Sequence, residues 1–323
     1  MKAVRINEFG DVDVLQWEEV PDPKPRPRPR HVLIKVDSSG VNYAEVMRRT
    51  GNYPGPGLPS SMGLEAAGTV VEVGSEVTDI SVGQKVMAMG PGCQAEYVTV
   101  NSSLVFPYPE TLDPVHAGGM PVVFLTSYHL LKTRGQMQTG DTVLVHAGAS
   151  GVGTVAIQLA KAWGAKVIAT ASTQDKLDLA RSLGADITIN YTTDDFEEAV
   201  QQETGGQGVE LVLEAVGGPV LEKSLRLVAQ YGRLVTYGAA SGETASLSAA
   251  DISGSNRTII SFSMGRSPVG TLDHKSAMAG LFQMIATGQA RLVVDRVLPM
   301  ANVAEAHTHL SNRGTRGKVI LTP

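Results

Sequence analysis

The clearest pattern of apolar and polar positions lies in the middle of the chain. The residues Thr142-Val-Leu-Val-His146 predict a buried strand, Gly148–Gly153 a tight turn and Thr154–Trp163 an amphipathic helix. A glycine-rich turn between a β-branched strand and a helix is typical of a nucleotide pyrophosphate site. There, free N–H groups and the positive end of the helix dipole face the anion. The alternative is a plain strand–turn–helix corner.

The patterns on either side of this turn predict two kinds of structure. Residues 1–120 consist of short apolar segments between Gly, Pro and Asp turns, such as His31–Val36 and Gly68–Val73, and predict a β-rich region. From Thr142 onward, strands such as Val209–Leu213 and Gly232–Thr236 alternate with helical stretches. This alternation predicts an α/β fold with a doubly wound parallel sheet.

The segment from Arg291 to the end is too short to fold alone. It begins with Leu292-Val-Val-Asp-Arg-Val-Leu298 and ends with a helical stretch and a final strand, Gly317–Thr322. We expect it to return to the first domain and to place an interdomain cleft beside the nucleotide. The predicted domains are therefore 1–123 with 291–323, and 124–290.

The second strand of the parallel sheet indicates which nucleotide is bound. NAD-binding sites of this kind place an Asp or Glu at the end of that strand, about 20 residues past the glycines, to hold the ribose 2′-hydroxyl. Here Lys166–Thr170 leads into Ala171-Ser172-Thr173-Gln174-Asp175-Lys176, with no acid at the strand end. Ser172 and Lys176 suit a 2′-phosphate, which favours NADPH. Alternatively, Ser172 and Gln174 only cap the helix and Lys176 is solvated, and the nearby Asp175 weakens the distinction.

Composition narrows the class of protein. The chain has 323 residues, is 42% hydrophobic and 18% charged, and carries a formal net charge of −5, which argues against general nucleic-acid binding. Because there is no signal-peptide pattern and no apolar run of about 18 residues, we expect a cytoplasmic protein. The single cysteine, Cys93, excludes an intramolecular disulfide and has no evident base beside it. The seven histidines, including His307 and His309, show no metal-binding spacing.

One segment has a biased composition, Pro21-Asp-Pro-Lys-Pro-Arg-Pro-Arg-Pro-Arg30. It is interpreted as a stiff surface connection between two strands. A basic polyproline ligand for a partner module is the alternative.

Several motifs together resemble the medium-chain dehydrogenase/reductase superfamily over essentially the whole chain. Besides the nucleotide turn they are Gly40-Val-Asn-Tyr-Ala-Glu45, Gly51-Asn-Tyr53, Gly63-Leu-Glu-Ala-Ala-Gly68, Ile189-Asn-Tyr191 and Tyr237-Gly-Ala-Ala-Ser-Gly242. Within the superfamily the chain most resembles the zinc-free NADPH:quinone oxidoreductases, the group of ζ-crystallin. The resemblance implies a Rossmann-type sheet inserted after a β-rich GroES-like domain.

The resemblance also bears on zinc. The zinc enzymes of the superfamily carry a Cys after the Gly-Val of the first motif and a His in a Gly-His-Glu motif. This chain has Asn42 and Leu64 at those positions and lacks the lobe with four closely spaced cysteines. Since a catalytic zinc usually needs three protein ligands, we expect a metal-free enzyme.

The family pattern implies two residues at the reacting groups. Asn42 matches an Asn near the nicotinamide and the substrate, and Tyr53 matches a Tyr able to donate its phenolic hydrogen to a carbonyl oxygen. The alternatives are that Asn42 satisfies loop backbone and that Tyr53 packs beside Pro54. The chain departs from the pattern at Met47, where the quinone reductases often carry a second Tyr, so its substrate preference is expected to differ.

The resemblance assigns the other binding residues by position. It gives the pyrophosphate turn to Ser150, Gly151, Val152 and Gly153, and the 2′-phosphate to Ser172, Lys176 and Tyr191. The nicotinamide side is expected to receive Thr126, backbone groups of Gly238 and Ala239, and Phe262 and Ser263 on the sixth strand. Arg313 corresponds to a basic residue that returns toward the nucleotide, and Arg316 is an equal candidate by charge.

The expected function follows from a reduced nicotinamide without a metal. Hydride delivery to a quinone or enone needs only one or two hydrogen-bond donors for the charge that develops on a conjugated oxygen. We therefore expect an NADPH-dependent reductase of small conjugated carbonyls, dimeric as its family usually is. The alternatives are an enoyl-thioester or 2-alkenal reductase, or a nucleotide-binding structural or RNA-associated protein with little turnover.

Overall fold

The structure is a computed structural model that describes residues 1–23, 28–253, 256–267 and 272–323. Part of the proline- and arginine-rich segment, residues 24–27, lies outside the described residues. The chain divides into two compact units. Unit 1 comprises Met1–Val123, His274–Phe282 and Leu292–Pro323, and unit 2 comprises Phe124–Asp273 and Gln283–Arg291.

Unit 1 is built from β-strands, with short helices between them. Its larger sheet has the order β15-β16-β3-β5-β6-β8, with β7 also paired to β3, and its smaller sheet has the order β2-β1-β4. The strands are β1 (Lys2–Ile6), β2 (Gln16–Glu19), β3 (His31–Val41), β4 (Ser60–Ser61), β5 (Glu65–Val73), β6 (Lys85–Met89), β7 (Tyr97–Asn101), β8 (Val105–Pro107), β15 (Val294–Pro299) and β16 (Lys318–Thr322). Its helices are α1 (Tyr43–Arg49), α2 (Pro114–Gly118) and α10 (Val303–Ser311).

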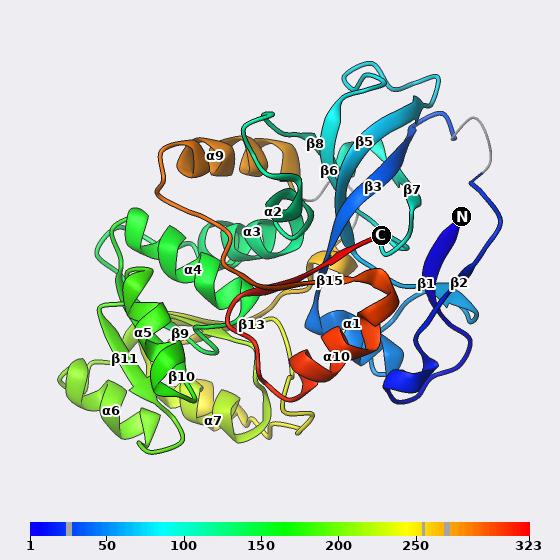
Figure 1. Ribbon diagram of the computed structural model, residues 1–323. Coiled ribbons are helices and arrows are strands. Elements are labelled where there is room, and N and C mark those ends of the chain that lie inside the picture. The colour runs from blue at the N-terminus through cyan, green and yellow to red at the C-terminus, as the bar shows by residue number, and fades with distance from the viewer. Residues whose placement is uncertain (24–27, 254–255, 268–271) are drawn as a thin grey trace. The chain divides into compact units, whose positions relative to one another are not determined.

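The C-terminal strands complete the larger sheet of unit 1. Strand β16 pairs antiparallel with β3, with Ile320 opposite Gly40, so a strand from the C-terminal part of the chain joins the sheet that β3 begins (Figure 1). Val319 and Leu321 of β16 join Val36 and Val41 of β3 in one buried apolar cluster. Burial of these alternating apolar side chains holds the final strand against a strand from the beginning of the chain.

Unit 2 contains a six-stranded parallel sheet of order β11-β10-β9-β12-β13-β14. The strands are β9 (Thr142–Val145), β10 (Lys166–Ala171), β11 (Ile187–Asn190), β12 (Val209–Glu214), β13 (Val228–Thr236) and β14 (Thr258–Ser261). The helices of this part are α4 (Gly151–Ala162), α5 (Gln174–Ser182), α6 (Phe196–Glu203), α7 (Gly218–Arg226) and α8 (Ala249–Ile252). Helices α3 (Pro121–Tyr128) and α9 (His274–Ala286) each contain residues of both units. Numbered along the chain, the sheet order is that of a Rossmann fold.

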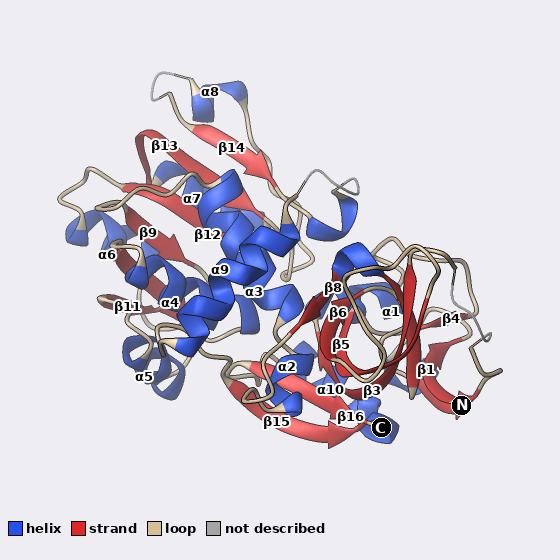
Figure 2. Ribbon diagram, turned by 90° about the horizontal axis from the view of Figure 1, so that it is seen from above, coloured by secondary structure: helices blue, strands red, loops and turns tan. Residues whose placement is uncertain are grey.

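The strands of unit 2 alternate between two buried faces. Leu144 and Val212 point to the face covered by α6 and α7, where they share a cluster with Phe196 and Leu225. The intervening residues, such as Val143, are equally buried and belong to the opposite face. Figure 2 shows helices on both sides of these strands. Burial on both faces explains why the strands are continuous apolar runs rather than alternating ones.

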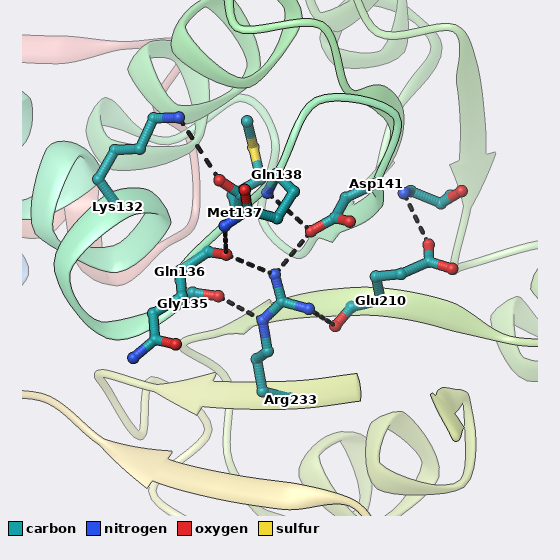
Figure 3. A network of polar contacts seen from close by, with 9 residues as sticks. Lys132, Gly135, Gln136, Met137, Gln138, Asp141, Glu210 and Arg233 are labelled. Atoms are coloured by element: carbon teal, nitrogen blue, oxygen red, sulfur yellow. Dashed lines mark hydrogen bonds and ion pairs between the residues drawn. The ribbon is translucent and has the colours of Figure 1, made fainter. Parts of the chain in front are cut away.

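A network around Arg233 of β13 fastens the segment that follows α3. The helical path continues from α3 through a π-helical stretch, His129–Arg134. The Arg233 guanidinium donates to the carbonyl oxygens of Gly135, Gln136 and Glu210, and it pairs with Asp141 at 2.6 Å (Figure 3). Because neither charged side chain is more than 17% exposed, this pair is largely desolvated.

Two expectations from the sequence need correction. Helix α4 is not amphipathic in the usual sense, because Gly153 through Ala160 are all buried. Phe262 and Ser263 do not lie on the sixth strand. Strand β14 ends at Ser261, and the Phe262 N–H makes a last bond to the Thr236 oxygen before the chain turns into a short 3₁₀ helix. Among the described residues, no helix is long and apolar enough to cross a membrane.

Candidate active site

Most of the predicted nucleotide-binding residues follow the carboxyl ends of the strands in unit 2. Strands β9, β10, β11, β13 and β14 run parallel, so the segments after them meet at one edge of the sheet. This edge carries Ser150, Gly151, Val152, Gly153, Ser172, Tyr191, Gly238, Ala239, Phe262 and Ser263. Ligands of doubly wound sheets bind at this edge, where the strand order reverses between β9 and β12.

The glycine-rich turn presents free donors at the start of α4. Ser150 is the N-cap, and its hydroxyl accepts the Gly153 N–H at 3.0 Å. Within the described part of the chain, the N–H groups of Gly151 and Val152 have no protein acceptor. A Cβ at position 153 would lie 2.3 Å from the Ala147 oxygen, so only glycine allows this approach of helix and turn. The turn therefore fits a pyrophosphate, which would accept from the two free N–H groups at the positive end of α4.

The ends of β10 and β11 bring two predicted phosphate ligands side by side. Ala171, the last residue of β10, pairs with Asn190, the last residue of β11, and the Tyr191 N–H donates to the Ala171 oxygen. Ser172 and Tyr191 are the residues that directly follow these two strands. The Tyr191 side chain is 40% exposed. Lys176 is the third residue of α5, in the helix's first turn. This arrangement of a hydroxyl, a phenol and an ammonium group fits a phosphate monoester.

The alternative interpretation, that Ser172 and Gln174 cap the helix, is wrong. The N-cap of α5 is Thr173 rather than Ser172 or Gln174, and it makes no side-chain bond to the helix backbone. Its hydroxyl instead donates to the exposed Asp175 carboxylate. The Ser172 carbonyl accepts from the Thr192 hydroxyl at 3.2 Å, which ties the loops after β10 and β11 together.

Glu214, which the sequence analysis missed, shapes the loop beside Gly238 and Ala239. Its buried carboxylate accepts the N–H groups of Val216 and Gly217 at 2.5 and 2.8 Å, and burial raises its pKa. The Ala215 oxygen in turn accepts from the Ala240 N–H. An acid directly after the predicted strand Val209–Leu213 was the available signal for this residue.

The remaining predicted cofactor residues lie in different places. Thr126 is buried on α3, and Phe262 is buried with its ring 6.2 Å from that of His129. Ser263 is the N-cap of the 3₁₀ helix after β14. Arg313 follows α10 in unit 1, with a positive φ of 54°.

In unit 1, Asn42 belongs to a buried ring of three polar side chains. Lys318 of β16 donates to the Asn42 Oδ1 at 2.6 Å and pairs with the Glu65 Oε1 at 2.6 Å. The Asn42 Nδ2 donates to the same Glu65 oxygen at 2.9 Å. The side chains of Lys318 and Glu65 are 3% and 0% exposed. Asn42 therefore does not satisfy loop backbone with its amide, as the alternative interpretation held.

A second layer surrounds this ring. The other Glu65 oxygen accepts the Val122 N–H at 2.7 Å. Glu45 of α1 lies 3.4 Å from the Asn42 Nδ2 and accepts from the Gln94 side chain at 2.6 Å. Burial is the main cause that raises the pKa of Glu45 to about 7. Among these residues, the sequence motifs indicated a role only for Asn42.

The other residues singled out in the sequence are placed as follows. Tyr53 lies on the loop after α1, and Met47 lies on α1 itself. Both side chains are partly exposed. The Cys93 thiol is buried and donates to the Gly90 oxygen. Burial raises its pKa, as expected for a thiol that takes no part in the reaction. Within the described ranges, no group of three or more His, Cys, Asp or Glu is arranged to hold a metal ion.

A Rossmann sheet with a glycine-rich first turn, inserted into a β-rich unit, defines a nucleotide-dependent oxidoreductase of the medium-chain dehydrogenase/reductase type. Family models agree with this class. Residues 28–110 match "Alcohol dehydrogenase GroES-like domain", and residues 151–287 match "Zinc-binding dehydrogenase".

Individual relatives narrow the class. The chain is 34% identical to a quinone oxidoreductase of Pseudomonas aeruginosa over 100% of this chain and 99% of the relative. It is 33% identical to a 2-haloacrylate reductase of a Burkholderia species over 99% and 98% of the two chains. Its fold matches the Escherichia coli quinone oxidoreductase complexed with NADPH with a TM-score of 0.93, 29% identity and full coverage of both chains. The chain belongs to the quinone oxidoreductase family of the medium-chain dehydrogenase/reductases.

Proposed function

We propose that this protein is an NADPH-dependent reductase that transfers hydride to quinones and other small conjugated carbonyls. The observation that carries the proposal is the nucleotide-binding edge of unit 2, where no acidic side chain stands directly at the end of β10. There, free N–H groups at the start of α4 fit a pyrophosphate, and Ser172 and Tyr191 adjoin at the ends of β10 and β11. The solved structure of the E. coli relative with NADPH supports the same cofactor.

The residues of unit 2 are proposed to bind and orient the cofactor. Gly151 and Val152 donate to the pyrophosphate, while Ser172, Lys176 and Tyr191 bind the 2′-phosphate. Bound NADPH supplies the hydride. Thr126, Gly238, Ala239, Phe262 and Ser263 are proposed to hold the nicotinamide end, and Arg313 of unit 1 to contribute a positive charge to nucleotide binding.

The residues of unit 1 are proposed to act on the acceptor. Tyr53 donates a hydrogen bond to the carbonyl oxygen, where negative charge develops as the acceptor is reduced. Asn42, held by Glu65 and Lys318, lies beside the reacting groups and fixes their orientation. Met47 replaces a second phenolic donor with an apolar surface, which favours compact apolar acceptors.

The proposed reaction needs no zinc. The positions that hold zinc ligands in related enzymes are Asn42 and Leu64, and the Asn42 amide is already bound to Lys318 and Glu65. Elemental analysis of the purified protein should therefore find no stoichiometric zinc. One zinc per chain that is needed for activity would contradict this part of the proposal.

A panel of acceptors tests the function. NADPH consumption is followed by absorbance with an ortho-quinone, a para-quinone, a small enone, a 2-alkenal and an enoyl-CoA. We expect turnover with the quinones and the enone. The 2-haloacrylate reductase among the relatives supports including a halogenated acrylate as well.

Preference for the thioester would favour the enoyl-thioester reductase. NADPH binding without turnover of any acceptor would favour a structural or RNA-associated protein.

Cellular location and assembly complete the proposal. We propose a cytoplasmic protein that acts as a homodimer. Size-exclusion chromatography with light scattering tests the dimer, and a monomeric mass would overturn it.

A further inference from the structure

Asn42, Glu65 and Lys318 together determine which way the Asn42 amide faces. An ammonium group only donates hydrogen bonds and a carboxylate only accepts them. Lys318 therefore must face the amide oxygen, and Glu65 must face the amide nitrogen, as the distances of 2.6 and 2.9 Å show. A flipped amide would point its oxygen at a carboxylate and its nitrogen at an ammonium. The chemistry of the ring thus permits one orientation.

The ring also limits what Asn42 can offer a ligand. Its Nδ2 faces Glu65 and, at 3.4 Å, Glu45, so both amide hydrogens are directed at carboxyl groups. The Oδ1 accepts from Lys318 and keeps one further lone pair. Asn42 is therefore an acceptor toward any bound molecule, and donation to the substrate carbonyl falls to another group.

The surroundings leave Lys318 few other partners. Its side chain is 3% exposed, and a Cβ at Gly40 would lie 2.6 Å from the Lys318 Cε and 2.5 Å from the Glu65 Oε1. Gly40 thus leaves the space that the ion pair fills. A buried ammonium is costly unless it is paired, and Glu65 meets this requirement.

We infer that Lys318 is a positioning residue of the active site, which with Glu65 locks the Asn42 amide as an acceptor. Lys318 does not touch the substrate; it acts through Asn42. This inference rests on the proposed function, because the purpose of the lock is to orient the groups that react. It assigns a role to the final strand of the chain, which lies 276 residues beyond Asn42.

Kinetics of Lys318→Met compared with the wild-type protein test the inference. We expect kcat for a quinone to fall about tenfold or more, because misplaced reacting groups lose rate steeply. The Kd for NADPH, measured by fluorescence, should change by less than about twofold, because the proposed nucleotide ligands lie mainly in unit 2. Lys318→Arg keeps a long cation that donates to Asn42 and should recover a large part of kcat.

Two further variants separate positioning from folding. Lys318→Met with Glu65→Gln removes the unpaired buried charge, so its Tm should recover while kcat stays low. Arg49→Met deletes another buried cation of unit 1, paired with Asp11, and should lower Tm without lowering kcat. A kcat that follows Tm across these variants, or a Lys318→Met protein with wild-type kcat, would overturn the inference.

NMR of protein with isotope-labelled asparagine reads the amide without using activity. The Asn42 side-chain hydrogens should exchange slowly with water in the wild-type protein and rapidly in Lys318→Met. Equal exchange in both would overturn the lock. A wild-type protein that shows slow exchange but turns over no acceptor would have the fixed Asn42 amide without the proposed activity. That result would overturn the proposed function and, with it, the catalytic role of Lys318.

Discussion

Glu45 is the residue with the clearest consequence for pH dependence. It is fully buried between Asn42 and Gln94, and burial raises its pKa from 4.5 to about 7. The folded protein therefore binds the Glu45 proton more tightly than the unfolded chain does. Its contribution to stability is complete below pH 4.5 and is lost as the pH rises through about 7.

We predict that Glu45→Gln removes this loss. Relative to the variant, the wild-type protein should lose roughly 3 kcal/mol of unfolding free energy as the pH rises from below 4.5 to above about 7. His146 and His307 oppose the trend, because burial lowers their pKa values to about 4 and 3, and they stabilise the fold above the ordinary histidine pKa. Urea titrations of both proteins at several pH values cancel the histidine contribution. A constant difference between them would contradict the account of Glu45.

Lys176 carries the proposed preference for NADPH. A charge-assisted hydrogen bond to a phosphate contributes about 1.5–3 kcal/mol, so Lys176→Ala should weaken NADPH about tenfold or more and leave NADH nearly unchanged. Fluorescence titration with both nucleotides measures this. Lys161→Ala, at the other end of α4, removes an exposed lysine paired with Asp186 and is the matched control. Equal losses for the two nucleotides would mean that the 2′-phosphate is bound elsewhere.

At the residue scale, the sequence indicated which residues belong to the site better than it indicated which side chains they contact. Asn42 stood in a recognisable motif, but its partner Lys318 comes from the far end of the chain. No local pattern pairs these two residues, because their contact depends on the antiparallel pairing of β16 with β3. Glu214 was missed for a similar reason, since its role depends on the path of the loop after β12.

At the scale of elements, the turn before α4 is where packing and binding depend on the same atoms. Gly153→Ala would place a Cβ 2.3 Å from the Ala147 oxygen and 2.9 Å from the Gly148 Cα. We predict a loss of about 1–3 kcal/mol in unfolding free energy and a rise of about tenfold or more in the Kd for NADPH, because the helix must move away from the turn.

The matched control for this prediction is another helical glycine. Gly280 lies on α9, and a Cβ there would meet no atom within 4 Å. Gly280→Ala should stabilise the protein by about 0.5–1 kcal/mol and leave NADPH binding unchanged. Chemical denaturation and nucleotide titration of both variants measure the contrast. A Gly153→Ala protein with wild-type stability and NADPH affinity would contradict this account of the turn.

The elements predicted best were those with a strong local signal. Strands β9, β10 and β12 lie where the β-branched runs placed them, each within one residue of the expected end. Helix α4 was located correctly, but its burial on all sides was not, because its exposed-looking positions such as Thr154 and Gln158 are buried by other elements. Gln158 illustrates the reason, since its side chain bonds to the backbone of Arg291, far along the chain.

At the scale of the whole molecule, the regular alternation of strands and helices predicted the parallel sheet of unit 2. The C-terminal return was also predicted, because Leu292–Thr322 is too short to fold alone, and β15 and β16 do join the larger sheet of unit 1. The identity of the acceptor was not predictable, since the proposed acceptor residues sit on loops such as the one that carries Tyr53.

The transfer of an isotope from cofactor to product tests the central claim most directly. Protein treated with a chelator is given NADPH that carries deuterium at its transferable position, together with a small enone, and the product is analysed by mass spectrometry. The account predicts one deuterium on the β-carbon of the saturated product, formed without added metal. An unlabelled product, or a reaction that proceeds only after zinc is added, would contradict it.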